Sequence, residues 1–437
     1  MFYPRTFLAF ATMLFPFSVS YSQVIDIDKN SVDAQAWVIY DAQSKQIIAS
    51  DQQDVQRAPA SLTKIMVAYL MLEAIREGRY SLEQKLTVPE SVKSIDVLES
   101  KMDLKAGEQV SIHDLLTGLI VMSANDAALT IADNLGNKDS QKFIELMNQS
   151  AVKLGMKNTH FANASGITMD GHYSTAHDMA ILSDAIINTT PEYLNFAKLQ
   201  QFQFKNSTHE ATNLLLKRDN TIDGLKTGYT EAAGYNFAVT ANRIDPNTKQ
   251  NRRIIVVILG TKSKQQRADI AQHLLNIAYT YTQNQPILAN SQKLARIPIV
   301  NGQYNYYPVY LQPQQNIQTL SLLPTAQVLG LKKYDVNKQR FVLNEKPLVT
   351  IEPTTKPEGL QFDVKLQQQQ LNAPMQQQNM PLLTLQVKQF DQIILENHIS
   401  QTIQLQPETW WQSIVRKLSA FFQGEKNTTA TIYPINT

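Results

Sequence analysis

The most informative stretch of this sequence reads Arg57-Ala58-Pro59-Ala60-Ser61-Leu62-Thr63-Lys64. A residue before proline is pushed away from helical dihedral angles, so we expect an extended lead-in that ends at Pro59. The apolar residues that follow have a spacing that predicts a helix, at Leu62, Ile65, Met66, Tyr69, Leu70 and Ile75. On this helix Ser61 and Lys64 share one face, which places a lysine amine beside a serine hydroxyl.

Two more motifs follow in order along the chain, Ser123-Ala124-Asn125 and Lys226-Thr227-Gly228. With the first motif they match the ordered signature of enzymes whose serine is acylated by an amide substrate. A second match to the serine–lysine spacing, Ser150-Ala151-Val152-Lys153, lies inside an amphipathic run and is interpreted as chance. The structural alternative, a helix-capping serine and a solvated lysine, explains one motif alone but not the ordered trio.

The chemistry of acyl transfer explains why these residue types occur together. A serine hydroxyl needs a neighbouring base, and Lys64 can act as one only when its amine is neutral. Burial and the positive charge of Lys226 would both lower the pKa of Lys64. Ser123 can relay a proton to the leaving nitrogen, and Asn125 can orient substrate amides. The Lys226-Thr227-Gly228 motif is typical of a strand edge, where its lysine and threonine can bind a substrate carboxylate.

At these residues the chain resembles the low-molecular-mass penicillin-binding proteins that are D-alanyl-D-alanine carboxypeptidases, serine peptidases of family S11. The resemblance extends to Lys157-Asn158-Thr159-His160-Phe161, Asp223-Gly224-Leu225-Lys226-Thr227-Gly228-Tyr229-Thr230 and Ala233-Gly234-Tyr235-Asn236, and is close over about residues 30 to 285. It implies an α/β (α+β) fold like that of penicillin-binding proteins and β-lactamases, an antiparallel sheet with helices on both faces. Histidine follows the third motif in some relatives, whereas Tyr229 stands here, so the pH dependence and the handling of penicillin can differ.

The resemblance also implies the roles of individual residues. Ser61 is the acyl-ester nucleophile, Lys64 the proton acceptor and Ser123 a second catalytic serine. The implied substrate-binding residues are Asn125, Lys226, Thr227, Gly228 and Arg267. The expected substrate is the peptidoglycan pentapeptide that ends in D-Ala-D-Ala, in cell-wall maturation and cell shape. β-Lactam antibiotics are the expected covalent inhibitors, and no metal or cofactor is expected.

Two other functions remain open from the sequence. A class A β-lactamase shares the three motifs but uses a glutamate in an E-x-x-L-N loop to activate water. The nearest text here, Glu192-Tyr193-Leu194-Asn195, is one residue too short. A non-catalytic binding protein on the same fold is the second alternative, and the intact Ser61, Lys64, Ser123 and Lys226 argue against it.

Composition and the N-terminus predict a compartment. The chain has no cysteine, which excludes disulfides and thiol catalysis, and its net charge of +2 argues against a nucleic-acid partner. Arg5, the apolar stretch Phe7 to Val19 and small residues after it predict a signal peptide at residues 1–22. An uncleaved membrane anchor is the alternative, although the stretch is short for a span. We expect a periplasmic protein attached peripherally to the outer face of the bacterial inner membrane.

Three further segments are predicted after a catalytic domain at residues 23–285. Asn301-Gly302 and the alternating apolar residues of 360–366 and 383–387 predict a small antiparallel β domain at 286–405. The glutamine-rich stretches at 367–370 and 376–378 are interpreted as exposed strand and loop, with disorder as the alternative. The pattern of residues 406–423 predicts an amphipathic helix that lies on a membrane surface. Its apolar face carries Trp410, Trp411, Ile414, Leu418, Phe421 and Phe422. A helix packed on the β domain is the alternative, and 424–437 is expected to be a polar tail.

Overall fold

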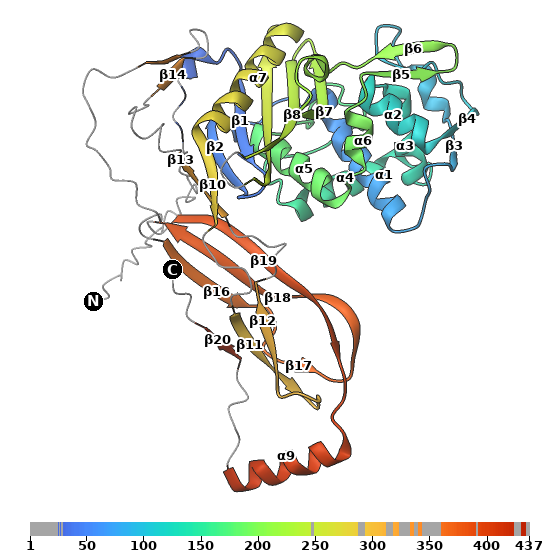
Figure 1. Ribbon diagram of the computed structural model, residues 1–437. Helices are drawn as coiled ribbons and strands as arrows, with labels where there is room; N and C mark the ends of the chain where they lie inside the picture. Colours follow the sequence, from blue (N-terminus) through green and yellow to red (C-terminus); the bar gives the residue numbers. More distant parts are fainter. Residues whose placement is uncertain are drawn as a thin grey trace, which may run out of the picture.

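The computed structural model describes residues 25, 27, 29–245, 249–286, 293–311, 318–322, 333–335, 340–342, 360–389, 392–423 and 430–433. A broad N-terminal body is joined to a narrow arm of β-strands, and a helix lies at the far end of the arm (Figure 1). The expected signal peptide and most of the expected polar tail lie outside the described residues.

A five-stranded antiparallel sheet in the order β2-β1-β9-β8-β7 forms the centre of the body. Its strands are β1 (Ala36–Asp41), β2 (Gln46–Asp51), β7 (Ile222–Thr230), β8 (Gly234–Ile244) and β9 (Asn251–Thr261). Alternate residues of β9 enter different cores: Ile255 and Val257 join the larger one, and Val256 and Ile258 the smaller one. Both faces of the sheet are therefore buried, which explains the unbroken apolar run of β9.

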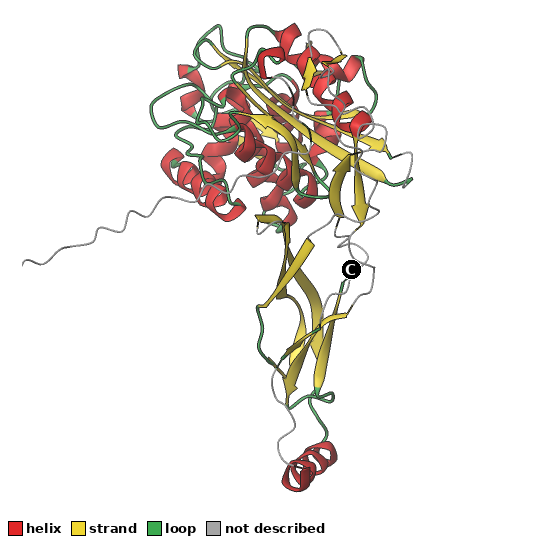
Figure 2. Ribbon diagram, turned by 90° about the vertical axis from the view of Figure 1, so that its left-hand side faces the viewer, coloured by secondary structure: helices red, strands yellow, loops and turns green. Residues whose placement is uncertain are grey.

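Helices cover both faces of this sheet (Figure 2). The smaller core lies under α7 (Lys264–Tyr281). The larger core contains α1 (Lys64–Arg76), α2 (Ile112–Val121), α3 (Asn125–Leu135), α4 (Ser140–Leu154), α5 (Ala176–Thr189) and α6 (Tyr193–Ala197). Short elements complete the body: η1 (Lys29–Ser31), η2 (Ala60–Thr63), η3 (Glu90–Ser94), η4 (Leu214–Lys217), β3 (Lys85–Thr87), β4 (Gln109–Ser111), β5 (Gln201–Phe204) and β6 (Ser207–Glu210).

The predicted elements of the body are present, with shifted boundaries. The Ser111 side chain accepts a hydrogen bond from Asp114 N at 3.1 Å and so caps α2. The helix expected from Ser61 instead begins as the 3-10 helix η2, and α1 begins only at Lys64. The hairpin strands β8 and β9 are longer than predicted because main-chain pairing continues past their apolar segments to Ile244 and Asn251.

The arm is made of strands with a hydrophobic core of their own. It contains β11 (Lys293–Val300), β12 (Tyr306–Tyr310), β16 (Leu360–Leu366), β17 (Leu371–Asn372), β18 (Met375–Gln389) and β19 (Gln392–Leu405). Two separate two-stranded sheets are formed by β10 (Thr282–Pro286) with β13 (Gln318–Leu322) and by β14 (Lys333–Asp335) with β15 (Arg340–Val342). The predicted inward residues Leu383, Leu385 and Val387 lie in the core of the arm. Residues 376–378 are exposed positions of β18, so this glutamine-rich stretch forms a strand as predicted.

The helix at the end of the arm, α9 (Trp410–Gln423), is tied to the arm on both sides. Before it, Glu408 N donates to Asn301 O at 2.9 Å. After it, the tail returns as β20 (Thr431–Ile432), which pairs with β11, and Tyr433 N donates to Leu294 O at 2.9 Å. The sequence did not predict this last strand. Among the described residues, no helix has the length and apolar character needed to cross a membrane.

Candidate active site

The nucleophile predicted from the sequence lies in η2, directly before α1. Ala60 has a positive φ of 51°, and Thr63 Oγ1 donates to its carbonyl oxygen at 2.8 Å. Lys64 Nζ lies 3.0 Å from Ser61 Oγ and also donates to Ser165 O at 2.5 Å. The structure therefore brings the predicted nucleophile and base into direct contact.

Burial sets the protonation of the predicted base. Lys64 is only 1 % exposed, and this burial lowers its pKa to about 7, against smaller opposing effects of Glu99 and Asp126. The two buried amines of Lys64 and Lys226 repel each other when both are charged, and this repulsion is resolved at Lys226. Burial and then the charges of Lys64 and Arg267 hold the pKa of Lys226 well below its usual range.

The second motif occupies the turn between α2 and α3. Ser123 has a φ of 68°, a left-handed conformation that is uncommon for serine and frequent at functional sites. Its Oγ is buried and has no hydrogen-bond partner among the described residues. Asn125 begins α3, and its side-chain amide donates to the Glu99 carboxylate while its backbone N–H donates to Ser100 O at 2.7 Å. The hydroxyl of Ser123 is thus left available for a substrate.

The third motif lies on β7, an edge strand of the central sheet. Thr227 Oγ1 donates to Thr212 Oγ1 at 2.7 Å, and Lys226 Nζ donates to the carbonyl oxygen of Thr227 at 2.8 Å. A Cβ on Gly228 would lie 3.0 Å from Ser61 N, so this glycine allows β7 to approach the nucleophile. The unpaired edge of β7 therefore lies beside Ser61.

Arg267, on the first turns of α7, adds a buried cation behind this strand. Its guanidinium donates to Gly228 O at 3.1 Å, to Asn236 O at 3.3 Å and to Thr212 O at 3.3 Å. Burial lowers the pKa of Arg267 to about 10, so the group remains charged at neutral pH. The three carbonyl acceptors fix the guanidinium without neutralising its charge.

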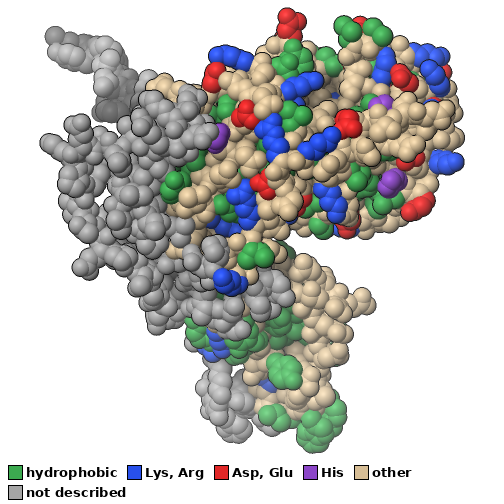
Figure 3. Space-filling view, turned by 45° about the horizontal axis from the view of Figure 1, so that its top comes forward, with side chains coloured by type: hydrophobic (Ala, Val, Ile, Leu, Met, Phe, Trp, Pro, Cys, Tyr) green, Lys and Arg blue, Asp and Glu red, His purple; other side chains and the backbone are tan. Residues whose placement is uncertain are grey.

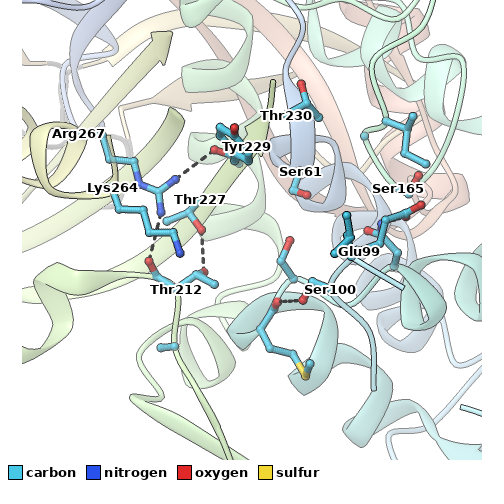
Figure 4. A pocket seen from close by; sticks show the side chains of 18 of the residues that line it. Ser61, Glu99, Ser100, Ser165, Thr212, Thr227, Tyr229, Thr230, Lys264 and Arg267 are labelled. Atoms are coloured by element: carbon cyan, nitrogen blue, oxygen red, sulfur yellow. Dashed lines mark hydrogen bonds between the residues drawn. The ribbon is translucent and has the colours of Figure 1, made fainter. Parts of the chain in front are cut away.

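These groups meet at a pocket of about 670 Å³ (Figure 4). Six of the sequence-predicted site residues line it: Ser61, Ser123, Asn125, Thr227, Gly228 and Arg267. Lys64 and Lys226 are not part of the lining and lie buried beneath it. Lys226 therefore acts on the pocket through Thr227 and through its position, rather than by exposing its amine.

Sequence reasoning missed several residues of this site. Glu99 lines the pocket and binds Asn125, and Ser165 and Thr212 supply partners for Lys64 and Thr227. Behind Ser61, His172 Nδ1 accepts from Ala162 N at 2.9 Å, and its Nε2 lies 2.8 Å from Thr63 Oγ1. Glu99, Ser165 and Thr212 come from loops, and no local sequence pattern identifies them as site residues.

The glutamate that a class A β-lactamase would need is not at the site. Glu192 is exposed at the start of α6, and it is not among the residues that line the pocket. The following Tyr193 is buried in the larger core. The short Glu192–Asn195 segment is thus a structural element of the body.

Comparisons with known proteins agree with this geometry. Residues 23–263 match the family model described as D-alanyl-D-alanine carboxypeptidase. The chain is 35% identical over 278 residues to the D-alanyl-D-alanine carboxypeptidase DacC of Escherichia coli, covering 62% of this chain and 67% of the relative. It is 33% identical over 323 residues to DacD of Salmonella typhimurium, covering 73% and 78%.

Solved structures show a similar architecture. Penicillin binding protein 5 from Haemophilus influenzae aligns with a TM-score of 0.61 and 25% identity, over 86% of this chain and 97% of that one. Penicillin-Binding Protein D2 from Listeria monocytogenes, in its ampicillin-bound form, aligns with a TM-score of 0.50 and 32% identity, over 56% and 97%. The first likeness includes the arm as well as the body.

Proposed function

Because this chain belongs to the D-alanyl-D-alanine carboxypeptidase family, we propose that its pocket removes the terminal D-alanine of peptidoglycan pentapeptides through an acyl-enzyme on Ser61. The protein is a serine-type, penicillin-binding carboxypeptidase, a hydrolase of the bacterial cell wall. One observation carries the mechanism: a buried lysine with a pKa of about 7 lies 3.0 Å from the serine hydroxyl.

Acylation begins with the neutral amine of Lys64. Its nitrogen takes the proton of Ser61 Oγ as that oxygen attacks the carbonyl carbon between the two alanines. The C–N bond then breaks, and the leaving nitrogen takes a proton that Ser123, with its unpartnered buried hydroxyl, is placed to relay. The departing D-alanine is replaced by water, which hydrolyses the ester and restores Ser61.

Substrate orientation follows from the charges on the two sides of the nucleophile. The terminal carboxylate of the peptide is attracted to Arg267 and Thr227, because a fixed guanidinium is a strong partner for a carboxylate. On the other side, Asn125 orients the amide of the acyl donor. β-Lactams carry a carboxylate and a reactive amide in one ring system, so they acylate Ser61 in the same pocket.

Ser61→Ala tests this function directly. The variant should release no D-Ala from diacetyl-Lys-D-Ala-D-Ala and should take up no fluorescent penicillin, because no hydroxyl remains to form the ester. Ser150→Ala is the matched control, since Ser150 and Lys153 form the same spacing on α4, outside the pocket. Labelling of the Ser61 variant, or loss of labelling in the control, would contradict the assignment.

We propose that α9 attaches the enzyme to a membrane surface from the periplasmic side. Trp410 and Trp411 are 64% and 62% exposed, and their rings stack with centroids 4.2 Å apart. Figure 3 shows hydrophobic side chains gathered at the end of the arm. Tryptophans on a helix that also carries Arg416 and Lys417 in its sequence suit the headgroup region of a bilayer. This exposure argues against a helix that packs on the β domain.

The chain is divided into segments with different proposed functions. We propose that residues 1–22 direct secretion and are removed, and that 23–285 perform the chemistry. Residues 286–405 form the arm, 406–423 the membrane-association helix and 424–437 the tail. The separate hydrophobic cores of body and arm support this division.

A further inference from the structure

The pocket carries opposite charges on opposite sides of the nucleophile. Figure 4 shows Arg267 and Lys264 on one side of Ser61 and Glu99 on the other. The cationic side is explained by the terminal carboxylate of the substrate. The proposed reaction assigns no task to the acidic side.

The hydrogen-bond donors that contact Glu99 are neutral. Its two oxygens accept hydrogen bonds from neutral donors, the side-chain amide of Asn125 and, at 3.2 Å, Asp96 N. Among the described residues, no lysine, arginine or histidine forms an ion pair with it. A carboxylate has about four lone-pair sites, so two remain for a ligand.

The second acidic residue of the pocket lining differs in this respect. Glu210, on β6, forms an ion pair with Lys217 at 2.6 Å. Its charge is already balanced by the protein. Glu99 is therefore the acidic lining residue whose charge is left for a ligand cation to balance.

The position of Glu99 defines where that cation belongs. Asn125 is the proposed partner of the acyl-donor amide, and Glu99 accepts a hydrogen bond from the same Asn125 side chain. The amide that Asn125 orients joins the penultimate alanine to the residue before it. We therefore infer that a side chain on that preceding residue comes near Glu99.

We propose that Glu99 is a specificity-determining residue that selects peptides with a free, protonated amino group on the side chain before the two alanines. The inference rests on the proposed function, since it concerns the acyl side of the same substrate. A lysine-like side chain has the length and charge to reach a carboxylate at this position. A peptide whose side-chain amine is acylated lacks the charge and is disfavoured.

Two substrates that differ only in this amine test the proposal. The values of kcat/KM for D-Ala release are compared for Nα-acetyl-Lys-D-Ala-D-Ala and diacetyl-Lys-D-Ala-D-Ala, with the full chain at neutral pH. We expect the wild type to prefer the free amine by about two- to fivefold, the range for a partly exposed ion pair. The preference should fall with added salt. Glu99→Gln should abolish it, and Glu99→Asp should retain part of it.

The comparison separates this role from an effect on the base. Glu99 also raises the pKa of Lys64, but both substrates meet the same Lys64, so that effect cancels in the ratio. Glu210→Gln is the matched control and should keep the wild-type ratio. An equal ratio in wild type and Glu99→Gln would overturn the inference while leaving D-Ala release intact. A wild type that releases D-Ala from neither peptide would overturn the proposed function and this inference with it.

Discussion

At the scale of single residues, Lys64 decides the pH dependence of the enzyme. Its pKa of about 7 means that the amine is protonated below that pH and cannot accept the proton of Ser61. The value of kcat/KM for the uncharged side-chain substrate diacetyl-Lys-D-Ala-D-Ala should therefore rise with pH and level off above about 7. Lys64→Arg should be inactive at every pH of the profile, because a guanidinium does not deprotonate in this range. An active arginine variant would mean that the base lies elsewhere.

Glu99→Gln should move that profile. The carboxylate raises the pKa of Lys64, so its removal lowers the pKa and shifts the rise in kcat/KM to lower pH. The pH–rate curve of the variant with the diacetylated peptide measures this shift. An unchanged or higher midpoint would show that the charge of Glu99 does not reach Lys64.

His172 supports the nucleophile from behind and makes stability depend on pH. Burial lowers its pKa to about 4 from an ordinary 6.5, so the folded state favours the neutral ring. Stability contributed by this group is complete above pH 6.5 and is lost as pH falls toward 4. His172→Gln preserves one donor and one acceptor, whereas His172→Phe leaves Ala162 N unpartnered at a cost of about 1–3 kcal/mol. The free energy of unfolding, measured in urea between pH 4 and 6.5, should depend less on pH in both variants than in the wild type.

The sequence predicts the part of the site that depends on local spacing. Ser61 and Lys64 are three residues apart, so any helical geometry brings them together. Glu99 and Thr212 reach the pocket through the tertiary fold, and their neighbours in sequence carry no repeated pattern.

At the scale of elements, Gly166 controls how closely two loops approach. Its φ is 86°, and a Cβ there would lie 2.1 Å from the carbonyl oxygen of Ala60. Gly166→Ala should therefore displace the residue before Ser61 and reduce penicillin labelling at least about tenfold, the effect of roughly 1.4 kcal/mol. Gly155→Ala is the control, since its φ is 81° but its Cβ would meet nothing within 4 Å. It should lower the melting temperature and leave labelling unchanged.

Pairing between neighbours in the chain was predictable, and pairing between distant strands was not. The hairpin of β8 and β9 follows from two apolar runs that flank a turn-rich stretch. The insertion of β1 between β2 and β9 joins residues more than two hundred positions apart, such as Val38 and Val257. No local pattern encodes such a partner. The return of the tail as β20 was missed for the same reason.

At the scale of the whole molecule, the proposed membrane helix and the pocket lie at opposite ends (Figure 1). Replacing Trp411 and Trp410 with glutamate should weaken binding to anionic liposomes by several kcal/mol, at about 25 cal/mol per Å² of apolar surface lost. Flotation of the signal-free protein measures the binding, with Ser150→Ala as an unaffected control. D-Ala release from a soluble peptide should be unchanged, because the pocket lies in the body. Equal flotation of wild type and variant would leave α9 without a role in attachment.

The long strands of the arm set a working height for the enzyme. β18 has 15 residues, and at about 3.3 Å per residue a strand of this length spans roughly 50 Å. With α9 on a lipid surface, as proposed, the arm would hold the body and its pocket at least about this far from the bilayer, so the pocket would reach stem peptides in a layer at that height. Removing paired residues from β18 and β19, two at a time to keep the inward and outward faces, would lower that layer stepwise. On this proposal the arm would select substrates by their height in the cell wall, independently of their chemistry.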